Sequence, residues 1–302
     1  MQKTSETRAT LASITIATLA CAALTLHAQT ASENYTIVPT YLGQGNSLVN
    51  GGQTIQNNSC VPTSTANGLA YLEAYQVNVL GQSDPFTVSP DNYTAVNSLQ
   101  GAQGVTASGT SAADALSGLN NYLASSNPAP NVVTSQTADP SAQSLANALN
   151  ANSAIQLGIL WGVVANDGTF IPTDMGGGHF VSLTGESLTA GSGTMTLLDP
   201  WGINGVSPNA GTQGASITVN VSTVNLTGVG NVLELIYPNT LTDPPDDLNT
   251  ENGTGVDSFG IASRTVGYIA VDDIESVVPE PTSMVLMGVG ALALLAKRRR
   301  SA

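Results

Sequence analysis

Two apolar segments lie at the ends of this 302-residue chain, and they confine any folded domain to the residues between them. At the N-terminus, Lys3 and Arg8 precede an apolar run over residues 11–26, and Ala28 completes a small-residue cleavage site. This order is typical of a secretory signal peptide, so we expect signal peptidase to remove residues 1–28. About 250 residues remain between the two ends, which is enough for one large domain.

The C-terminal segment has three parts. Pro279, Glu280 and Pro281 come first, an apolar run over residues 284–296 follows, and residues 297–300 are all basic. A permanent membrane helix needs about 20 apolar residues, and this run is shorter. Residues 279–302 resemble the PEP-CTERM signals of Gram-negative bacteria, which the membrane transpeptidase exosortase reads and cuts. The resemblance implies transient inner-membrane contact, and then a position at the cell surface, in the outer envelope or in an exopolysaccharide matrix.

The segment between the two ends is strongly acidic. Arg264 is its only basic residue, against 19 of the 21 acidic residues of the chain, because Glu6 and Glu280 lie outside it. Such a surface repels nucleic acid and anionic lipid, which makes binding to either improbable. The densest acidic run lies within residues 239–258, which read as a solvated Pro/Asp/Asn/Gly linker. The run lacks the ligand spacing of a calcium loop, and we expect no cofactor.

The segment changes character near its middle. Helices are expected to begin at Cys60 with Ser59 as the cap, at Ser111 with Asp114 three residues on, and at Asp139. Short β-rich stretches then follow at 155–164, 180–183, 194–198, 216–221 and 232–237, with a last strand or short β extension in 259–278. The order predicts an α+β domain over residues 29–238, with helices from the N-terminal half packed on a mostly antiparallel sheet.

Residues 29–278 contain a single cysteine, Cys60, and a single histidine, His179. Cys60 lies at an expected helix start, where unpaired N–H groups and the helix dipole favour a thiolate. His179 follows three glycines and opens an expected strand, while Asp199 ends the next one. An aspartate so placed can accept a hydrogen bond from the imidazole and fix its tautomer. The three residues therefore form a candidate nucleophile, base and orienting group.

These motifs resemble papain-like cysteine peptidases, and most closely the double-glycine leader peptidase group and its extracytoplasmic relatives. The resemblance covers roughly residues 50–202 and rests on the sequences CVPTS from Cys60, GHFV around His179 and DPWG from Asp199. It implies a papain-like fold, a peptide or protein substrate, and Cys60, His179 and Asp199 as nucleophile, base and orienting residue. The family commonly has glycine after the cysteine, where this chain has Val61. Thr54 occupies the position of the family's oxyanion glutamine, and we expect the nearby Gln56 to serve instead.

Other functions fit parts of the pattern. Transglutaminase-like acyl transfer uses the same residue order, and a cell-wall amidase would share the thiolate chemistry, although an acidic surface suits anionic wall polymers poorly. A zinc site would lack any paired ligand motif. Cys60 could instead be a buried small hydrophobe. The chain would then be a catalytically silent surface or matrix protein that keeps the fold as a structural module.

Overall fold

The computed structural model describes residues 28–32, 41–43, 58–84, 86, 90, 93–106, 108–126, 131–164, 167–172, 178–200, 215–237 and 266–277. Apart from Ala28, the predicted signal peptide, linker and sorting tail lie outside these residues. The described helices are α3 (Cys60–Ala74), the π-helical turn η3 (Tyr75–Val79) that continues it, α4 (Tyr93–Ala102), α5 (Ala112–Ser125) and α6 (Ala142–Asn150). The strands are β1 (Ala28–Ser32), β2 (Val132–Ala138), β3 (Ala154–Val164), β4 (Phe170–Pro172), β5 (Gly178–Thr189), β6 (Ser192–Asp199), β7 (Ala215–Leu226), β8 (Gly230–Ile236) and β9 (Val266–Val277).

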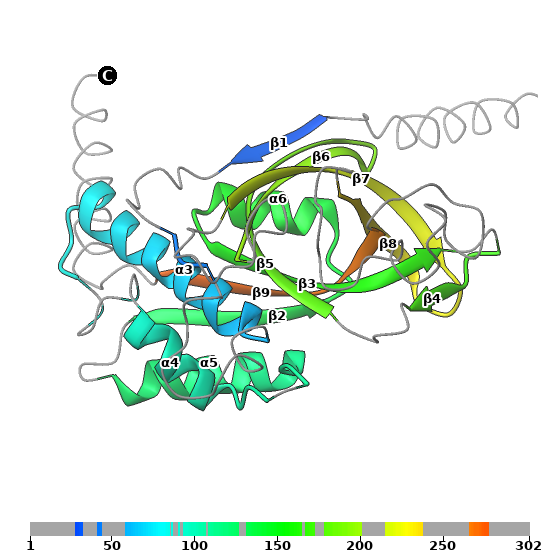
Figure 1. Cartoon of the computed structure of the whole chain (residues 1–302). Helices are drawn as coiled ribbons and strands as arrows, with labels where there is room; N and C mark the ends of the chain where they lie inside the picture. The colour runs from blue at the N-terminus through cyan, green and yellow to red at the C-terminus, as the bar shows by residue number, and fades with distance from the viewer. Residues whose placement is uncertain are drawn as a thin grey trace, which may run out of the picture.

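Six strands close into an antiparallel barrel (Figure 1). Strands β5, β6, β7, β8, β9 and β3 pair in that order, and β3 then pairs with β5. Strand β1 extends the sheet beside β5, β2 pairs with the far half of β9, and β4 pairs with the end of β3. The segment expected to form a short β extension thus supplies β9, which lies in the wall of the barrel between β8 and β3.

The predicted papain-like α+β fold is wrong. The described residues are mostly sheet, the sheet closes on itself, and strands occur in both halves of the chain rather than only after the helices. The fold could not be predicted from the sequence, because alternation of apolar and polar residues identifies a strand but not the strand with which it pairs. The pairing of β3 with β5 joins residues 154–164 to residues 178–189, and no periodicity records that closure.

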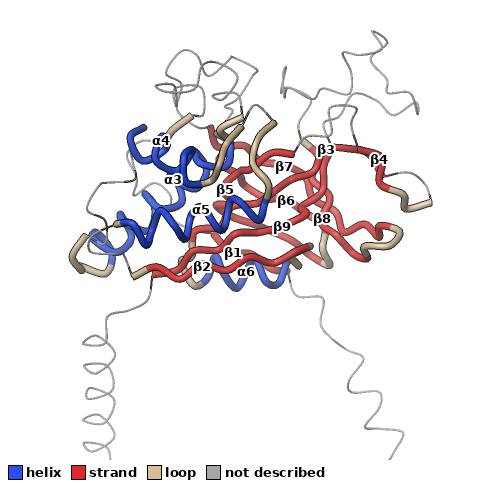
Figure 2. Tube along the Cα trace, turned by 90° about the horizontal axis from the view of Figure 1, so that it is seen from below, coloured by secondary structure: helices blue, strands red, loops and turns tan. Residues whose placement is uncertain are grey.

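Two clusters of apolar side chains form most of the core. Strand β7 shows how the first is built, because Ile217, Val219 and Val221 point inward while the residues between them are exposed. These side chains meet Leu145 and Leu149 of α6. The second cluster joins α3, α4 and α5, which lie together on one side of the strands while α6 lies apart from them (Figure 2).

The three expected helices are present, with differences at their starts. Helix α5 is capped as expected, because Ser111 accepts a hydrogen bond from the Asp114 N–H. Helix α6 begins later than expected, and Ser141 caps it rather than Asp139. The Asp139 backbone has a positive φ of 48°, and its N–H donates to the Ala270 carbonyl of β9. Helix α3 begins at Cys60, but the Ser59 side chain makes no cap hydrogen bond.

A buried polar layer separates the sheet from helices α3 and α5. The Gln136 side chain donates to Asp273 at 2.6 Å and to the Ala112 carbonyl at the start of α5. Burial raises the pKa of Asp273 to about 6, although the hydrogen bond from Gln136 opposes this. Burial and then the charge of Asp273 raise the pKa of the neighbouring Glu275 well above its ordinary value. The layer therefore holds protons to a higher pH than the unfolded chain, whose carboxyl groups ionise at about pH 4.

Gln156 of this layer explains a glycine inside α3. A Cβ at Gly68 would lie 2.2 Å from the Gln156 Nε2 and 3.2 Å from the Ala154 Cβ. Glycine normally destabilises a helix interior by about 1 kcal/mol relative to alanine. Here its missing side chain lets α3 approach β3 closely, and this approach brings the helix that carries Cys60 onto the sheet.

Candidate active site

Cys60 is the first residue of α3 and a free thiol. Its side chain is partly buried and packs with an apolar cluster that includes Val61, Phe180 and Val271. Phe180 follows His179 on β5, so this cluster brings the start of α3 to the strand that carries the histidine. The buried face of α3 rests on β5, where the Ser182 hydroxyl donates to the Ser64 carbonyl at 3.4 Å.

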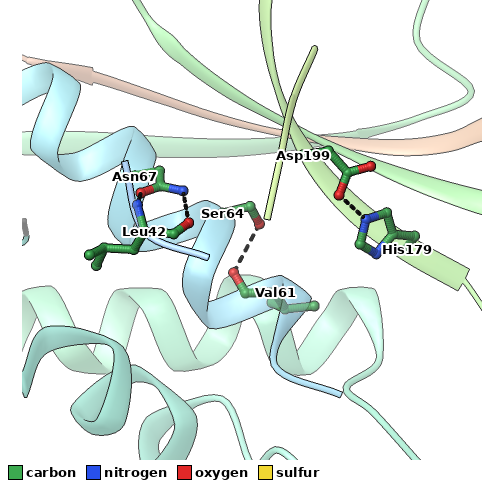
Figure 3. A network of polar contacts seen from close by, with 6 residues as sticks. All are labelled: Leu42, Val61, Ser64, Asn67, His179 and Asp199. Atoms are coloured by element: carbon green, nitrogen blue, oxygen red, sulfur yellow. Dashed lines mark hydrogen bonds and ion pairs between the residues drawn. The ribbon is translucent and has the colours of Figure 1, made fainter. Parts of the chain in front are cut away.

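His179 and Asp199 come from neighbouring antiparallel strands. His179 is the second residue of β5, and Asp199 is the last residue of β6. The His179 Nε2 lies 2.8 Å from the Asp199 Oδ1, and the two side chains are only 12% and 7% exposed. Figure 3 shows the imidazole turned toward the carboxylate, beside the first turn of α3 that Val61 marks. An ionised Asp199 accepts the Nε2–H, which fixes the orientation of the ring.

The close approach at this strand end depends on the glycine before the histidine. A Cβ at Gly178 would lie 2.8 Å from the Ile159 carbonyl oxygen of β3. Ile159 is also the register partner of His179. Gly178 therefore allows β5 to begin directly against β3.

The Cys60 side chain hydrogen-bonds to the His179 ring as well. Because Nε2 faces Asp199, Nδ1 is the ring nitrogen left for the sulfur. The structure thus brings together all three residues that the motifs selected. Gln56, the expected oxyanion donor, lies outside the described residues, as do Trp201 and the sorting residues 279–281.

The electrostatics of the site favour a protonated imidazole. Burial is the largest influence and by itself lowers the pKa of His179. The charge and hydrogen bond of Asp199, followed by the hydrogen bond and charge of Cys60, outweigh burial and raise that pKa from 6.5 to about 10. The ring therefore carries a proton at neutral pH.

An aromatic pair lies next to the imidazole. Trp161 of β3 stacks on His179 with ring centroids 6.1 Å apart and planes inclined by 22°. Tyr237 packs edge-on against Trp161 at 5.2 Å. Burial, and then the charge of Asp199, raise the pKa of Tyr237 well above 10, so it stays neutral beside the carboxylate. Both rings are buried, and Trp161 lies against one face of the imidazole.

Sequence reasoning did not select Trp161 or Tyr237 as site residues. Trp161 lies two residues beyond Ile159, the register partner of His179, so its stacking depends on how β3 and β5 align. A residue-by-residue pattern carries no information on that alignment. A tryptophan within a predicted strand was the only available signal, and it fits core packing equally well.

A side-chain amide fastens the segment before the site to α3. The Asn67 Nδ2 donates to the Leu42 carbonyl at 3.0 Å, and the Leu42 N–H donates to the Asn67 Oδ1 at 2.8 Å (Figure 3). The pair is buried and reproduces the exchange of two hydrogen bonds between strands. Asn67 therefore anchors residues 41–43 against α3, the helix that begins at Cys60.

Neither a metal site nor a spanning helix is found in the described part of the chain. No group of three or more His, Cys, Asp or Glu side chains in that part could hold a metal ion. None of the helices described there is both long and apolar enough to cross a bilayer.

Comparison with known proteins identifies the C-terminal segment. Residues 277–300 match the PEP-CTERM protein-sorting motif, as expected from Pro279, Glu280 and Pro281 and the arginines that follow. No curated protein matches the chain. The sorting motif indicates that this chain is an exported protein, which exosortase processes and which is displayed on the cell surface or in the extracellular matrix.

Proposed function

We propose that this exported protein is a thiol hydrolase that cuts peptide or isopeptide bonds through an acyl-enzyme on Cys60. One observation carries the proposal: the His179 ring hydrogen-bonds to Cys60 while its Nε2 lies 2.8 Å from Asp199. A nucleophile, a proton carrier and an orienting carboxylate in contact are the minimum set for acyl transfer. The proposal rests on these residues and not on any fold family.

The chemistry follows from the charge state of the pair. The Cys60 thiolate attacks the carbonyl carbon of the scissile bond and forms a C–S bond. As the C–N bond breaks, the imidazolium Nδ1–H gives its proton to the leaving nitrogen. Water then attacks the thioester and returns a proton to Nδ1. The C–S bond breaks, and this releases the acid and restores the thiolate and imidazolium.

Asp199 and Trp161 support both half-reactions. The carboxylate stabilises the imidazolium and holds Nδ1 toward the sulfur, because it accepts the proton on the opposite nitrogen. Trp161 stacks on the imidazole, and this apolar contact lowers the local dielectric and strengthens the attraction between imidazolium and carboxylate. Gln56 remains our prediction for the oxyanion donor, with the Cys60 backbone N–H as a second donor.

Acylation by p-nitrophenyl acetate, an activated ester, tests the proposal without knowledge of the natural substrate. We expect a burst of nitrophenolate and a mass increase of one acetyl group at Cys60. Cys60→Ala should abolish both while the fold, followed by circular dichroism, is retained. Asp114→Asn replaces an exposed carboxylate that hydrogen-bonds the Ser111 cap of α5, so it should acylate normally.

A peptide library then identifies the bond that is cut. The proposal is wrong if the unmodified chain and Cys60→Ala acylate at the same rate. That result would favour a surface or matrix protein without catalysis, a role that the acidic and lysine-free composition of residues 29–278 also suits.

A further inference from the structure

Helix α3 starts differently from the other helices that begin with a serine cap. Ser111 and Ser141 precede α5 and α6 in extended conformations, with ψ of 156° and 154°. Each accepts a hydrogen bond at 3.1 Å from the N–H three residues on. Ser59 precedes α3 with ψ of 23°, and its side chain makes no cap hydrogen bond. The first turn of α3 is therefore left without the usual side-chain acceptor.

The sequence gives a reason for this difference. The residue three positions after Ser59 is Pro62, which has no N–H to donate. The Thr63 N–H already donates to the Ser59 carbonyl at 3.1 Å. Only the N–H groups of Cys60 and Val61 remain in the first turn, and groups in this position have no partner within their own helix.

The Ser59 hydroxyl is instead held by a glutamine from another helix. The Gln100 Nε2 of α4 donates to the Ser59 Oγ at 2.7 Å, and both side chains are buried. This bond joins α4 to the residue directly before Cys60. The hydroxyl that accepts this bond makes no hydrogen bond to the first-turn N–H groups, where it would compete with an anion.

We propose that Gln100 is a positioning residue for the thiolate, a role that rests on the proposed function. By retaining the Ser59 hydroxyl, Gln100 leaves the Cys60 and Val61 N–H groups for negative charge on the sulfur or on a substrate oxygen. In Gln100→Ala the freed hydroxyl can rotate and accept the Val61 N–H. The thiolate then loses a hydrogen-bond donor and the helix gains a conventional cap.

Iodoacetamide alkylation of Cys60 in the exported chain, measured against pH, tests this role. Loss of one hydrogen bond to the thiolate should lower the rate of alkylation by about tenfold or more. We expect Gln100→Ala to alkylate at least about tenfold more slowly at pH 6 and to approach the unmodified chain at high pH. Ser59→Ala combined with Gln100→Ala removes the competing hydroxyl, so the double variant should regain the reactivity at low pH.

Gln103→Ala is the matched control. Gln103 is a second buried glutamine just after α4, and its Nε2 donates to Thr65 and to the Ala115 carbonyl, one turn beyond the start of α3. It should lower thermal stability about as much as Gln100→Ala and leave the pH profile unchanged. If Gln100→Ala does not fold, Gln100→Met keeps the side-chain length without the donor and should show the same loss.

The outcomes separate this inference from the function on which it rests. An ordinary thiol profile in the unmodified chain would overturn both. A reactive thiol in the unmodified chain, together with an unchanged profile in Gln100→Ala, would overturn the role of Gln100 alone. Failure of the double variant to recover would show that Gln100 acts only through packing, which also contradicts the inference.

Discussion

Replacing Asp199 with asparagine removes the charge that does most to keep the His179 ring protonated. The pKa of that ring is raised from 6.5 to about 10, which corresponds to about 5 kcal/mol in favour of the imidazolium. Burial opposes this rise and is the largest single influence, so it acts against the cation as soon as the carboxylate charge is lost. A nearby opposite charge typically changes a pKa by about 1 to 3. We therefore expect the pKa of His179 to fall from about 10 to between about 7 and about 9 in Asp199→Asn.

Proton NMR provides a direct assay. Within residues 29–278 His179 is the only histidine, so its Cε1–H gives one imidazole resonance to follow against pH. Asp114→Asn, which removes a carboxylate at the cap of α5, should leave that titration unchanged. A titration in Asp199→Asn that coincides with that of the unmodified chain would refute the electrostatic account of the site.

Two further predictions concern stability. Burial raises the pKa of Glu186 from 4.5 to about 7, so the unfolded chain ionises first and stability is lost as pH rises from about 4.5 to about 7. Glu186→Gln should remove that loss. In urea unfolding, the free energy of unfolding of this variant relative to the unmodified chain should rise by up to about 3 kcal/mol between pH 4 and pH 8. A difference that does not change with pH would contradict the raised pKa of Glu186. Gly68→Ala should lower the free energy of unfolding by about 1 to 3 kcal/mol because the new Cβ meets Gln156, whereas Gly101→Ala in α4 meets nothing within 4 Å and should raise it by up to about 1 kcal/mol. If Gly68→Ala unfolds at a higher temperature than Gly101→Ala, the packing of α3 on β3 is contradicted.

The sequence predicts individual elements better than their assembly. Strand β7 alternates regularly and was expected, whereas β2 is mostly polar and half exposed and was not. Strand β9 carries buried Asp273 and Glu275 where a core strand usually carries apolar residues, which weakens its signal. Helix α4 was also missed. None of these patterns states which strands pair, and closure of the barrel depends on that pairing.

The candidate site, too, could be predicted only in part from the sequence. Cys60, His179 and Asp199 could be selected because they are rare residues in characteristic motifs, and their catalytic roles remain predictions. Gln100 and Trp161 could not be selected, because their importance arises from contacts with residues far away in the chain. Gln100 meets Ser59 only through the packing of α4 on α3, and Trp161 meets the imidazole only through strand register.

In the proposed mechanism Cys60 acts as a thiolate paired with His179, and the pH dependence of Cys60 alkylation is the sharpest test of this pairing. The rate of reaction with iodoacetamide is measured by intact mass for residues 29–278 and for the same chain with His179→Ala. We predict a reactive plateau that extends well below the ionisation of an ordinary thiol at about pH 8.5, and its loss in the variant. Slow labelling with an ordinary thiol profile in both proteins would contradict this pairing and assign Cys60 a structural role.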